Sequence, residues 1–140
     1  MSMYFKLKKV VLEGHSISYH PRIKVTLSYG VKSKQVVAVL DTGSDLIYLP
    51  KNVADYFELP LSKEIFEART PNGTSKYTCS KMYVEVKKGH EFLKDLFDVV
   101  VPQDELHNEI ILGVPFLSKF SATFDYLNEK IILKKTVKKI

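Results

Sequence analysis

Asp41 stands between two apolar runs, in the segment VVAVLDTGSDLIYLP that extends from residue 36 to residue 50. An ionised carboxylate in such a position is costly unless neighbouring groups hydrogen-bond it. The residues that follow it, Thr42, Gly43 and Ser44, are suited to a tight turn that supplies such bonds. A carboxylate held in this way can take up and return a proton, which is general acid–base chemistry.

The same turn suits a carboxylate that works with a second one. Two carboxylates that share a proton around a water can hydrolyse a peptide bond, because the ionised one takes the proton of the water while the neutral one polarises the scissile carbonyl. Gly43 has no side chain, so its backbone can pass close to a partner turn and to a bound peptide. The Thr42 hydroxyl can donate a hydrogen bond to the partner turn. The Ser44 hydroxyl can donate one to Asp41, and such donation favours the ionised carboxylate. We therefore expect Asp41 to be half of a catalytic pair.

The elements expected to position this turn are mostly short strands. Residues 36–40 form a continuous apolar run, typical of a strand covered on both faces, and residues 46–49 are similar. Ile23, Val25 and Leu27 alternate with polar residues, as in a half-buried strand. Asn-Gly at positions 72–73, flanked by strand-forming residues, indicates a hairpin because both residues tolerate positive φ.

Further strands and a few helical residues complete the predicted architecture. Strands are expected at residues 82–86, 96–102 and 109–112, and a last hairpin turns at residues 127–129. Brief helical turns are expected after Pro50 and after Gly113. The sequence therefore predicts an all-β domain with one or two short helical turns.

The bulk composition indicates one globular domain over residues 1–140. A chain of 140 residues, 45% of them hydrophobic, can bury a core of its own. The single Cys79 excludes an internal disulfide, and no apolar run approaches the length that spans a membrane. Because the N-terminus also lacks the apolar block of a signal peptide, we expect no membrane association and no secretion. The histidines stand at no metal-ligand spacing, so neither a metal nor a cofactor is expected: His15, His20, His90 and His107.

The net charge of +5 raises the question of a nucleic-acid partner. The lysines gather near the two ends of the chain, where a solvated end, or a linker at residues 134–140, would explain them. A nucleic-acid-binding β-domain would interleave aromatic residues with Lys and Arg on one face. Five aromatic residues stand instead in largely apolar stretches, so we expect nucleic acid not to be a partner: Tyr48, Phe57, Phe97, Phe116 and Phe124.

Three features together, VLDTGSDLIYLP, the Asn-Gly hairpin and IILGVPFL, resemble the retropepsin class of aspartic proteases. This class occurs in retroviruses, LTR retrotransposons and plant pararetroviruses, and the pattern is most similar to the pararetroviral (caulimovirus and badnavirus) type. The resemblance covers residues 35–140 and leaves residues 1–34 outside it. It implies a closed acid-protease barrel with a flap hairpin, and a homodimer that cuts a viral Pol-type polyprotein in the host cytoplasm or the virion.

The resemblance also assigns roles to individual residues. Asp41 corresponds to the catalytic aspartate, Thr42 to the threonine that links two turns, and Gly43 to the close-approach glycine. Ser44 and Asp45 support the site. The flap corresponds to Pro71, Asn72, Gly73 and Thr74, and the strand behind the catalytic turn corresponds to Ile111, Leu112 and Gly113. Retroviral enzymes commonly place an Arg after this glycine, whereas Val114 and Pro115 follow here, so the partner of Asp45 stays open.

The chain contains a single Asp-Thr-Gly turn. Two-lobed enzymes of this chemistry carry two such turns in a chain more than twice as long, whereas Asp55, Asp98 and Asp125 are not followed by one. If Asp41 is catalytic, two chains must therefore build the site about a twofold axis. The alternatives are an LTR-retrotransposon or cellular retropepsin-like protease, and a non-catalytic binding module on the same fold.

Overall fold

The computed structural model of the 140-residue chain describes residues 2–11, 14, 17–70, 73–104 and 108–135. In chain order, the elements of these residues are β1 (Ser2–Lys6), β2 (Lys8–Val11), β3 (Ile17–His20), β4 (Arg22–Tyr29), β5 (Lys32–Leu40), β6 (Ile47–Tyr48), α1 (Lys51–Phe57), β7 (Phe66–Thr70), β8 (Gly73–Lys88), β9 (Glu91–Pro102), β10 (Ile110–Leu112), α2 (Val114–Leu117), β11 (Phe120–Asp125) and β12 (Lys130–Lys135).

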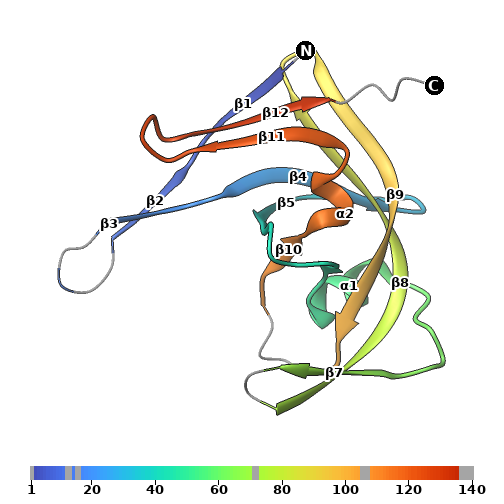
Figure 1. Cartoon of the computed structure of the whole chain (residues 1–140). Helices are drawn as coiled ribbons and strands as arrows, with labels where there is room; N and C mark the ends of the chain where they lie inside the picture. Colours follow the sequence, from blue (N-terminus) through green and yellow to red (C-terminus); the bar gives the residue numbers. More distant parts are fainter. Residues whose placement is uncertain (1, 12–13, 15–16, 71–72, 105–107, 136–140) are drawn as a thin grey trace.

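Six strands close into a barrel, in the order β4-β5-β10-β6-β9-β8 (Figure 1). The pairing of β4 with β8 closes the ring, and β7 extends the sheet beyond β8. Strand β10 lies parallel to β5 and antiparallel to β6, so it fills the space between the two strands that flank Asp41. The all-β barrel expected from the sequence is confirmed.

The alternating residues of β4 and β8 fill the barrel. Ile23, Val25 and Leu27 are 3%, 2% and 0% exposed, as their alternation with polar residues predicts. On β8, the side chains of Met82, Val84 and Val86 are fully buried against them. Burial of this kind contributes roughly 1.5–3 kcal/mol for each large apolar side chain. The core that carries the catalytic-type turn is therefore a closed, well-filled barrel.

Strand β5 departs from the sequence-based expectation in one respect. The prediction that residues 36–40 are covered on both faces is wrong, because Val37 is 47% exposed. Ala38 and Leu40 point into the barrel and are 0% and 2% exposed. In a small barrel alternate residues of a strand face outward, so an apolar run need not be buried throughout.

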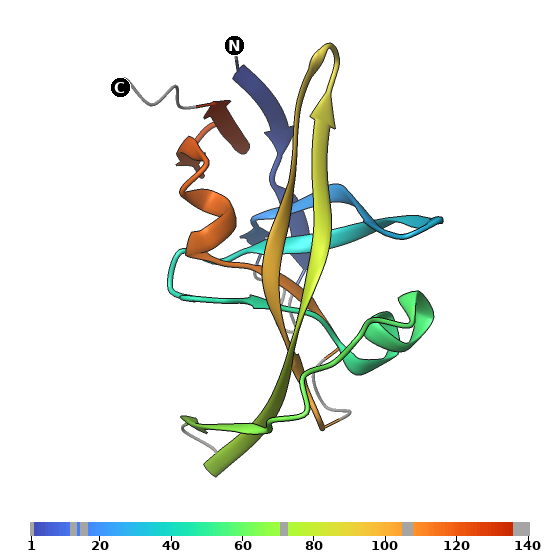
Figure 2. The same ribbon diagram turned by 90° about the vertical axis from the view of Figure 1, so that its right-hand side faces the viewer.

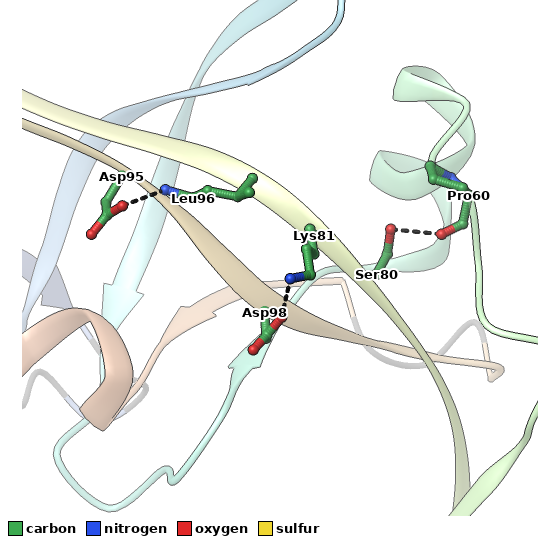
Figure 3. Close-up of polar contacts among 6 residues, drawn as sticks. All are labelled: Pro60, Ser80, Lys81, Asp95, Leu96 and Asp98. Carbon is green, nitrogen blue, oxygen red and sulfur yellow. Dashed lines mark hydrogen bonds and ion pairs between the residues drawn. The ribbon is translucent and has the colours of Figure 1, made fainter.

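Strands β8 and β9 form one long antiparallel ribbon, which the sequence analysis treated as two separate short strands. Its turn contains Gly89, whose φ of +63° is the left-handed conformation that glycine adopts readily. Cross-strand and neighbouring polar contacts accompany it, such as Lys81 Nζ at 3.6 Å from Asp98 Oδ1 (Figure 3). The Ser80 hydroxyl donates to the Pro60 carbonyl, at 2.8 Å, and so attaches the segment after α1 to the ribbon.

A second, three-stranded sheet in the order β1-β12-β11 covers one end of the barrel (Figure 1). Helix α2 joins the two parts, because the ring of Phe116 lies 5.9 Å from that of Phe97 on β9 and 5.3 Å from that of Phe120 on β11. The hairpin predicted at residues 127–129 is confirmed as the β11–β12 turn. Strands β2 and β3 pair with each other and project from the barrel (Figure 1).

Both short helices occur where the sequence predicts helical turns. Helix α1 begins after Pro50, and α2 begins after Gly113. Helix α1 ends at Glu58, which adopts the left-handed conformation and donates its N–H to backbone carbonyls of the last turn. Among the described residues, no helix is long and apolar enough to cross a membrane.

Candidate active site

The candidate site is the turn between β5 and β6, which carries Asp41. The Asp41 N–H donates to the Leu112 carbonyl at 3.1 Å, and the Val114 N–H donates to the Ser44 carbonyl at 2.8 Å. Within the turn, the Gly43 N–H donates to Asp41 Oδ1 at 2.9 Å. The turn is therefore fixed to β10 and α2 by backbone bonds on both sides.

Gly113 makes this anchoring sterically possible. A Cβ atom built at this position would lie 2.3 Å from the carbonyl oxygens of both Ser44 and Leu46. Such a distance is far inside van der Waals contact, so the backbones can approach this closely only where position 113 has no side chain. Leu112 is fully buried, and the backbone of Ile111 pairs with Val39 and Tyr48. Residues 111–113 thus lie directly behind the turn, as the resemblance implies.

Ser44 makes a different hydrogen bond from the one predicted. Its hydroxyl donates to the Leu46 carbonyl at 2.9 Å and accepts from the Leu46 N–H at 3.4 Å. The single hydroxyl proton is used within the turn. The predicted hydrogen bond from Ser44 to the Asp41 carboxylate is therefore wrong for this structure. In this structure Ser44 shapes the exit of the turn instead.

The tip of the turn faces outward. Asp41 is half-buried, whereas Thr42, Gly43 and Asp45 are exposed. A pocket of about 320 Å³ adjoins Asp41 and Thr42, with Pro21 and Tyr126 among its other lining residues. The part of the chain that the structure describes offers Asp45 no ion pair. The link between turns that the resemblance assigns to Thr42 stays a prediction.

Tyr48 lies beside the site. From the sequence it was recognised only as an aromatic residue in an apolar stretch. Burial, followed by the proximity of Tyr77, Asp45 and Asp41, raises the pKa of the Tyr48 phenol above its ordinary value of 10.0. Its ring lies 6.0 Å from that of Tyr77 on β8, edge to face. Strand β6 is only two residues long, so its sequence carries no alternation from which the direction of Tyr48 could be read.

The predicted hairpin at Asn72–Gly73 is confirmed as the pairing of β7 with β8, which ends at Thr70 opposite Gly73. Gly73 has φ of +119°, a conformation that L side chains rarely adopt. Thr74 is exposed and pairs with Arg69. Pro71 and Asn72 lie outside the described residues, so the tip of the predicted flap stays a prediction. At the base of the hairpin, Phe66 stands opposite Tyr77.

Within the ranges that the structure describes, no cluster of three or more His, Cys, Asp or Glu side chains is placed to hold a metal ion. The turn itself offers the Asp41 carboxylate and the hydrogen-bonding groups around it for general acid–base chemistry.

The sequence profile of one protein family matches residues 27–119, more than half of the chain, and the family is described as "gag-polyprotein putative aspartyl protease". This chain belongs to that family. It is an aspartic protease of the retropepsin type. The matched range contains the Asp41 turn, the β7–β8 hairpin and the strand that ends at Gly113. No curated protein matches the chain by sequence.

A solved structure shows the same fold. A retropepsin-like aspartic protease from Rickettsia conorii superimposes with a TM-score of 0.59 at 16% sequence identity, over 95% of this chain and 91% of that one. The EIAV protease in complex with the inhibitor HBY-793 matches with a TM-score of 0.49 at 16% identity, over 78% of this chain and 92% of that one. Because the Rickettsia match covers 95% of this chain, it extends into residues 1–34, which lie outside the resemblance found in the sequence.

Within this retropepsin-type fold, the structure brings together most of the residues that the sequence analysis singled out. Asp41 to Asp45 form one turn, and Ile111 to Gly113 support it from behind through the bonds described above. The β7–β8 hairpin is a separate structure, joined to the turn region through the Tyr48–Tyr77 ring contact.

Proposed function

We propose that the protein is a homodimeric endopeptidase that cuts the polyprotein of which it is a part, including at its own boundaries. The family description supports a gag-type polyprotein as the substrate. A viral source of the pararetroviral type, acting in the host cytoplasm or the virion, remains the sequence-based prediction within this proposal. The fold and the family support a protease. The polyprotein substrate and the homodimer are what we propose in addition.

The observation that carries the proposal is the outward-facing tip of a rigidly held turn. Thr42 and Gly43 are exposed, although backbone bonds to Leu112 and Val114 fix the residues on either side. A carboxylate pair needs a second acid within hydrogen-bonding distance of one water. Because the sequence has one such turn, a second copy of the chain is the natural source of the other acid.

In the proposed mechanism, Asp41 and its copy hold the attacking water between them. The ionised carboxylate accepts a proton from the water as the water attacks the scissile carbonyl carbon, and the protonated carboxyl donates a hydrogen bond to the carbonyl oxygen. The tetrahedral intermediate then collapses as the carboxyl group that took a proton from the water gives it to the leaving nitrogen, so that the pair again shares one proton. The Gly43 N–H, which donates to Asp41 Oδ1, fixes the direction in which the carboxylate points.

The substrate is proposed to bind as an extended strand beneath the β7–β8 hairpins of the two copies. Backbone hydrogen bonds to an added strand supply affinity that is independent of sequence, and side-chain pockets supply the preference. Apolar residues such as Leu46, which is 41% exposed and follows the turn, favour apolar side chains near the scissile bond.

Replacement of the candidate catalytic acid tests this function. Asp41→Asn should abolish cleavage of a precursor that contains the protein's natural flanking segments, because an amide can neither accept nor share the proton. The fold should be retained, since Asn keeps the oxygen that accepts from the Gly43 N–H. Cleavage is followed by gel electrophoresis and mass spectrometry of the products, and folding by circular dichroism.

Asp45→Asn serves as the matched control, because it removes a carboxylate from the same turn without touching the proposed pair. It should retain measurable cleavage. Substantial cleavage by Asp41→Asn would contradict the catalytic assignment. A wild-type protein that binds peptide but never cleaves it would instead identify a non-catalytic module on this fold.

A further inference from the structure

A basic groove runs between β1 and the outward side of β4, with β5 and β8 contributing to its floor. It has a volume of about 670 Å³, against about 320 Å³ for the pocket at Asp41, and the two share no lining residue. The only carboxylate among its lining residues is Glu85. The basic groove is defined here by its six cationic lining residues: Lys6, Arg22, Lys24, Lys87, Lys88 and Lys130.

Most lysines of the basic groove form no ion pair. Among the residues that the structure describes, Arg22 pairs with Glu109 and Lys130 stands opposite Asp125 on β11, whereas no ion pair is formed by the other four lysines of the groove. Three lysines elsewhere on the molecule do have acidic partners: Lys32, Lys81 and Lys119. Gathered ammonium groups repel one another and create a positive potential that a polyanion would relieve.

The floor of the groove is polar and regular. Cross-strand pairing places Gln35, Thr26 and Glu85 in one row across β5, β4 and β8. Side chains two residues apart on a strand share a face, so Lys24 and Lys87 stand on the same outer side as this row. The two ammonium groups therefore border the groove from neighbouring strands, where they could contact successive phosphates of one backbone.

Strand β1 contributes two aromatic residues, Tyr4 and Phe5, to the lining of the groove. Tyr4 is 56% exposed, and Phe5 is half-buried with Lys88 Nζ 5.5 Å from the centre of its ring. Figures 1 and 2 show the start of β1 near the turn that joins β8 to β9, at the opposite end of the ribbon from α1 and β7. The five aromatic residues that stand in largely apolar stretches of the sequence do not include Tyr4 or Phe5.

We propose that the basic groove binds single-stranded nucleic acid, with the phosphates on its lysines and a base stacked on Tyr4. Positively charged grooves with exposed aromatic side chains bind single strands largely without regard to sequence, because every base has a stacking face. An acidic polypeptide would pair with the lysines but would not need the aromatic residues of β1. The site is separate from Asp41, so its binding does not depend on the proposed protease mechanism.

The test is a fluorescence-anisotropy titration of the full chain with labelled oligo(dT) and oligo(U) of about 16 nucleotides, at several salt concentrations. The logarithm of the affinity should fall linearly with the logarithm of the salt concentration. Lys24→Gln/Lys87→Gln should weaken binding and reduce the magnitude of the salt slope by about one for each lysine. Lys63→Gln/Lys81→Gln removes the same net charge from exposed lysines outside the groove, and it should bind like the wild type.

Stacking is tested separately from charge. Tyr4→Ala should weaken binding by at least about fivefold at unchanged salt slope, whereas Tyr4→Phe should bind like the wild type. Thermal melts establish that each variant is folded. The proposal is overturned if the two double variants lose affinity equally, if Tyr4→Ala has no effect, or if poly-glutamate or a duplex of equal length competes as well as the single strand.

Discussion

At the scale of single residues, the site depends on what each small side chain permits. Gly113 allows two backbone carbonyls, those of Ser44 and Leu46, to approach where a Cβ would stand. Ser44 closes its turn through Leu46 and leaves the carboxylate of Asp41 to the Gly43 N–H. The geometry of the proposed acid is therefore set mainly by the backbone, and side-chain substitutions around it should separate into those that displace the backbone and those that do not.

Gly113→Ala is expected to displace the backbone of the Asp41 turn. The added methyl group would overlap two carbonyl oxygens, and relief of that overlap should cost about 3 kcal/mol or more together with most of the cleavage activity. The comparison is Gly30→Ala, where a Cβ meets nothing but φ is +61°, so that only about 1–2 kcal/mol is expected. Urea denaturation of both variants measures the difference. Equal losses would contradict the close-approach explanation.

Ser44→Ala distinguishes the observed hydrogen bond from the predicted one. Loss of the bonds to Leu46 should lower the free energy of unfolding by about 1 kcal/mol and leave the pH profile of cleavage in place. If Ser44 donated to Asp41 instead, its removal would raise the pKa of the pair and shift the profile. The measurement is kcat/KM against pH for both proteins, and a shifted profile would restore the sequence-based interpretation.

At the scale of elements, short hairpins with a clear turn signal were predictable and long-range pairings were not. The β7–β8 and β11–β12 hairpins were found from Asn-Gly and from the polar turn near Asn128. The insertion of β10 between β5 and β6 left no local signal, because parallel pairing joins residues some 70 positions apart. The barrel strand β5 also appeared fully buried in sequence, since apolar composition does not distinguish inward from outward residues.

The β11–β12 turn carries a pH dependence of its own. The Asn128 side chain donates to Asp125 Oδ2 at 2.8 Å and its N–H donates to Oδ1 at 3.0 Å, and these bonds hold the pKa of Asp125 below its ordinary value of 3.8. A lowered pKa in the folded state stabilises the fold above the unfolded pKa, and this contribution is lost as the pH falls through the folded pKa.

Asn128→Ala should therefore raise the pKa of Asp125 toward 3.8, although only in part, because the backbone N–H remains. The stability of the variant should also fall less steeply with acid than that of the wild type. Carboxyl NMR titration of Asp125 gives the first quantity, and thermal melts between pH 3 and 5 give the second. An unchanged pKa would mean that the side-chain bond is absent in solution.

At the scale of the whole molecule, the fold supplies one rigidly held turn, which is one half of the proposed two-chain site. The sequence identified that half, because Asp-Thr-Gly, the apolar strands around it and Ile-Leu-Gly are local patterns with a physical reason. It could not show which groove of the finished surface gathers lysines, since the residues that line the basic groove come from five strands, β1, β4, β5, β8 and β12. It also could not show Tyr48 beside the turn, because that position depends on the pairing of β6.

A dimer-built site makes cleavage depend on concentration. Dilution should lower the specific activity, in parallel with a fall in the mass measured by light scattering, because only the assembled pair holds two acids. A specific activity that stays constant while the mass falls to that of one chain would show that a single chain is sufficient.

The most direct test mixes active and inactive chains. With the total protein held constant and well above the dissociation constant of the dimer, wild-type protein is combined with an equal amount of Asp41→Asn, and the chains are allowed to exchange partners. If both acids must be present, random pairing leaves about a quarter of the wild-type activity, because only that share of dimers carries two aspartates. Activity that falls only to about half would mean that each chain works alone, which would contradict the shared site.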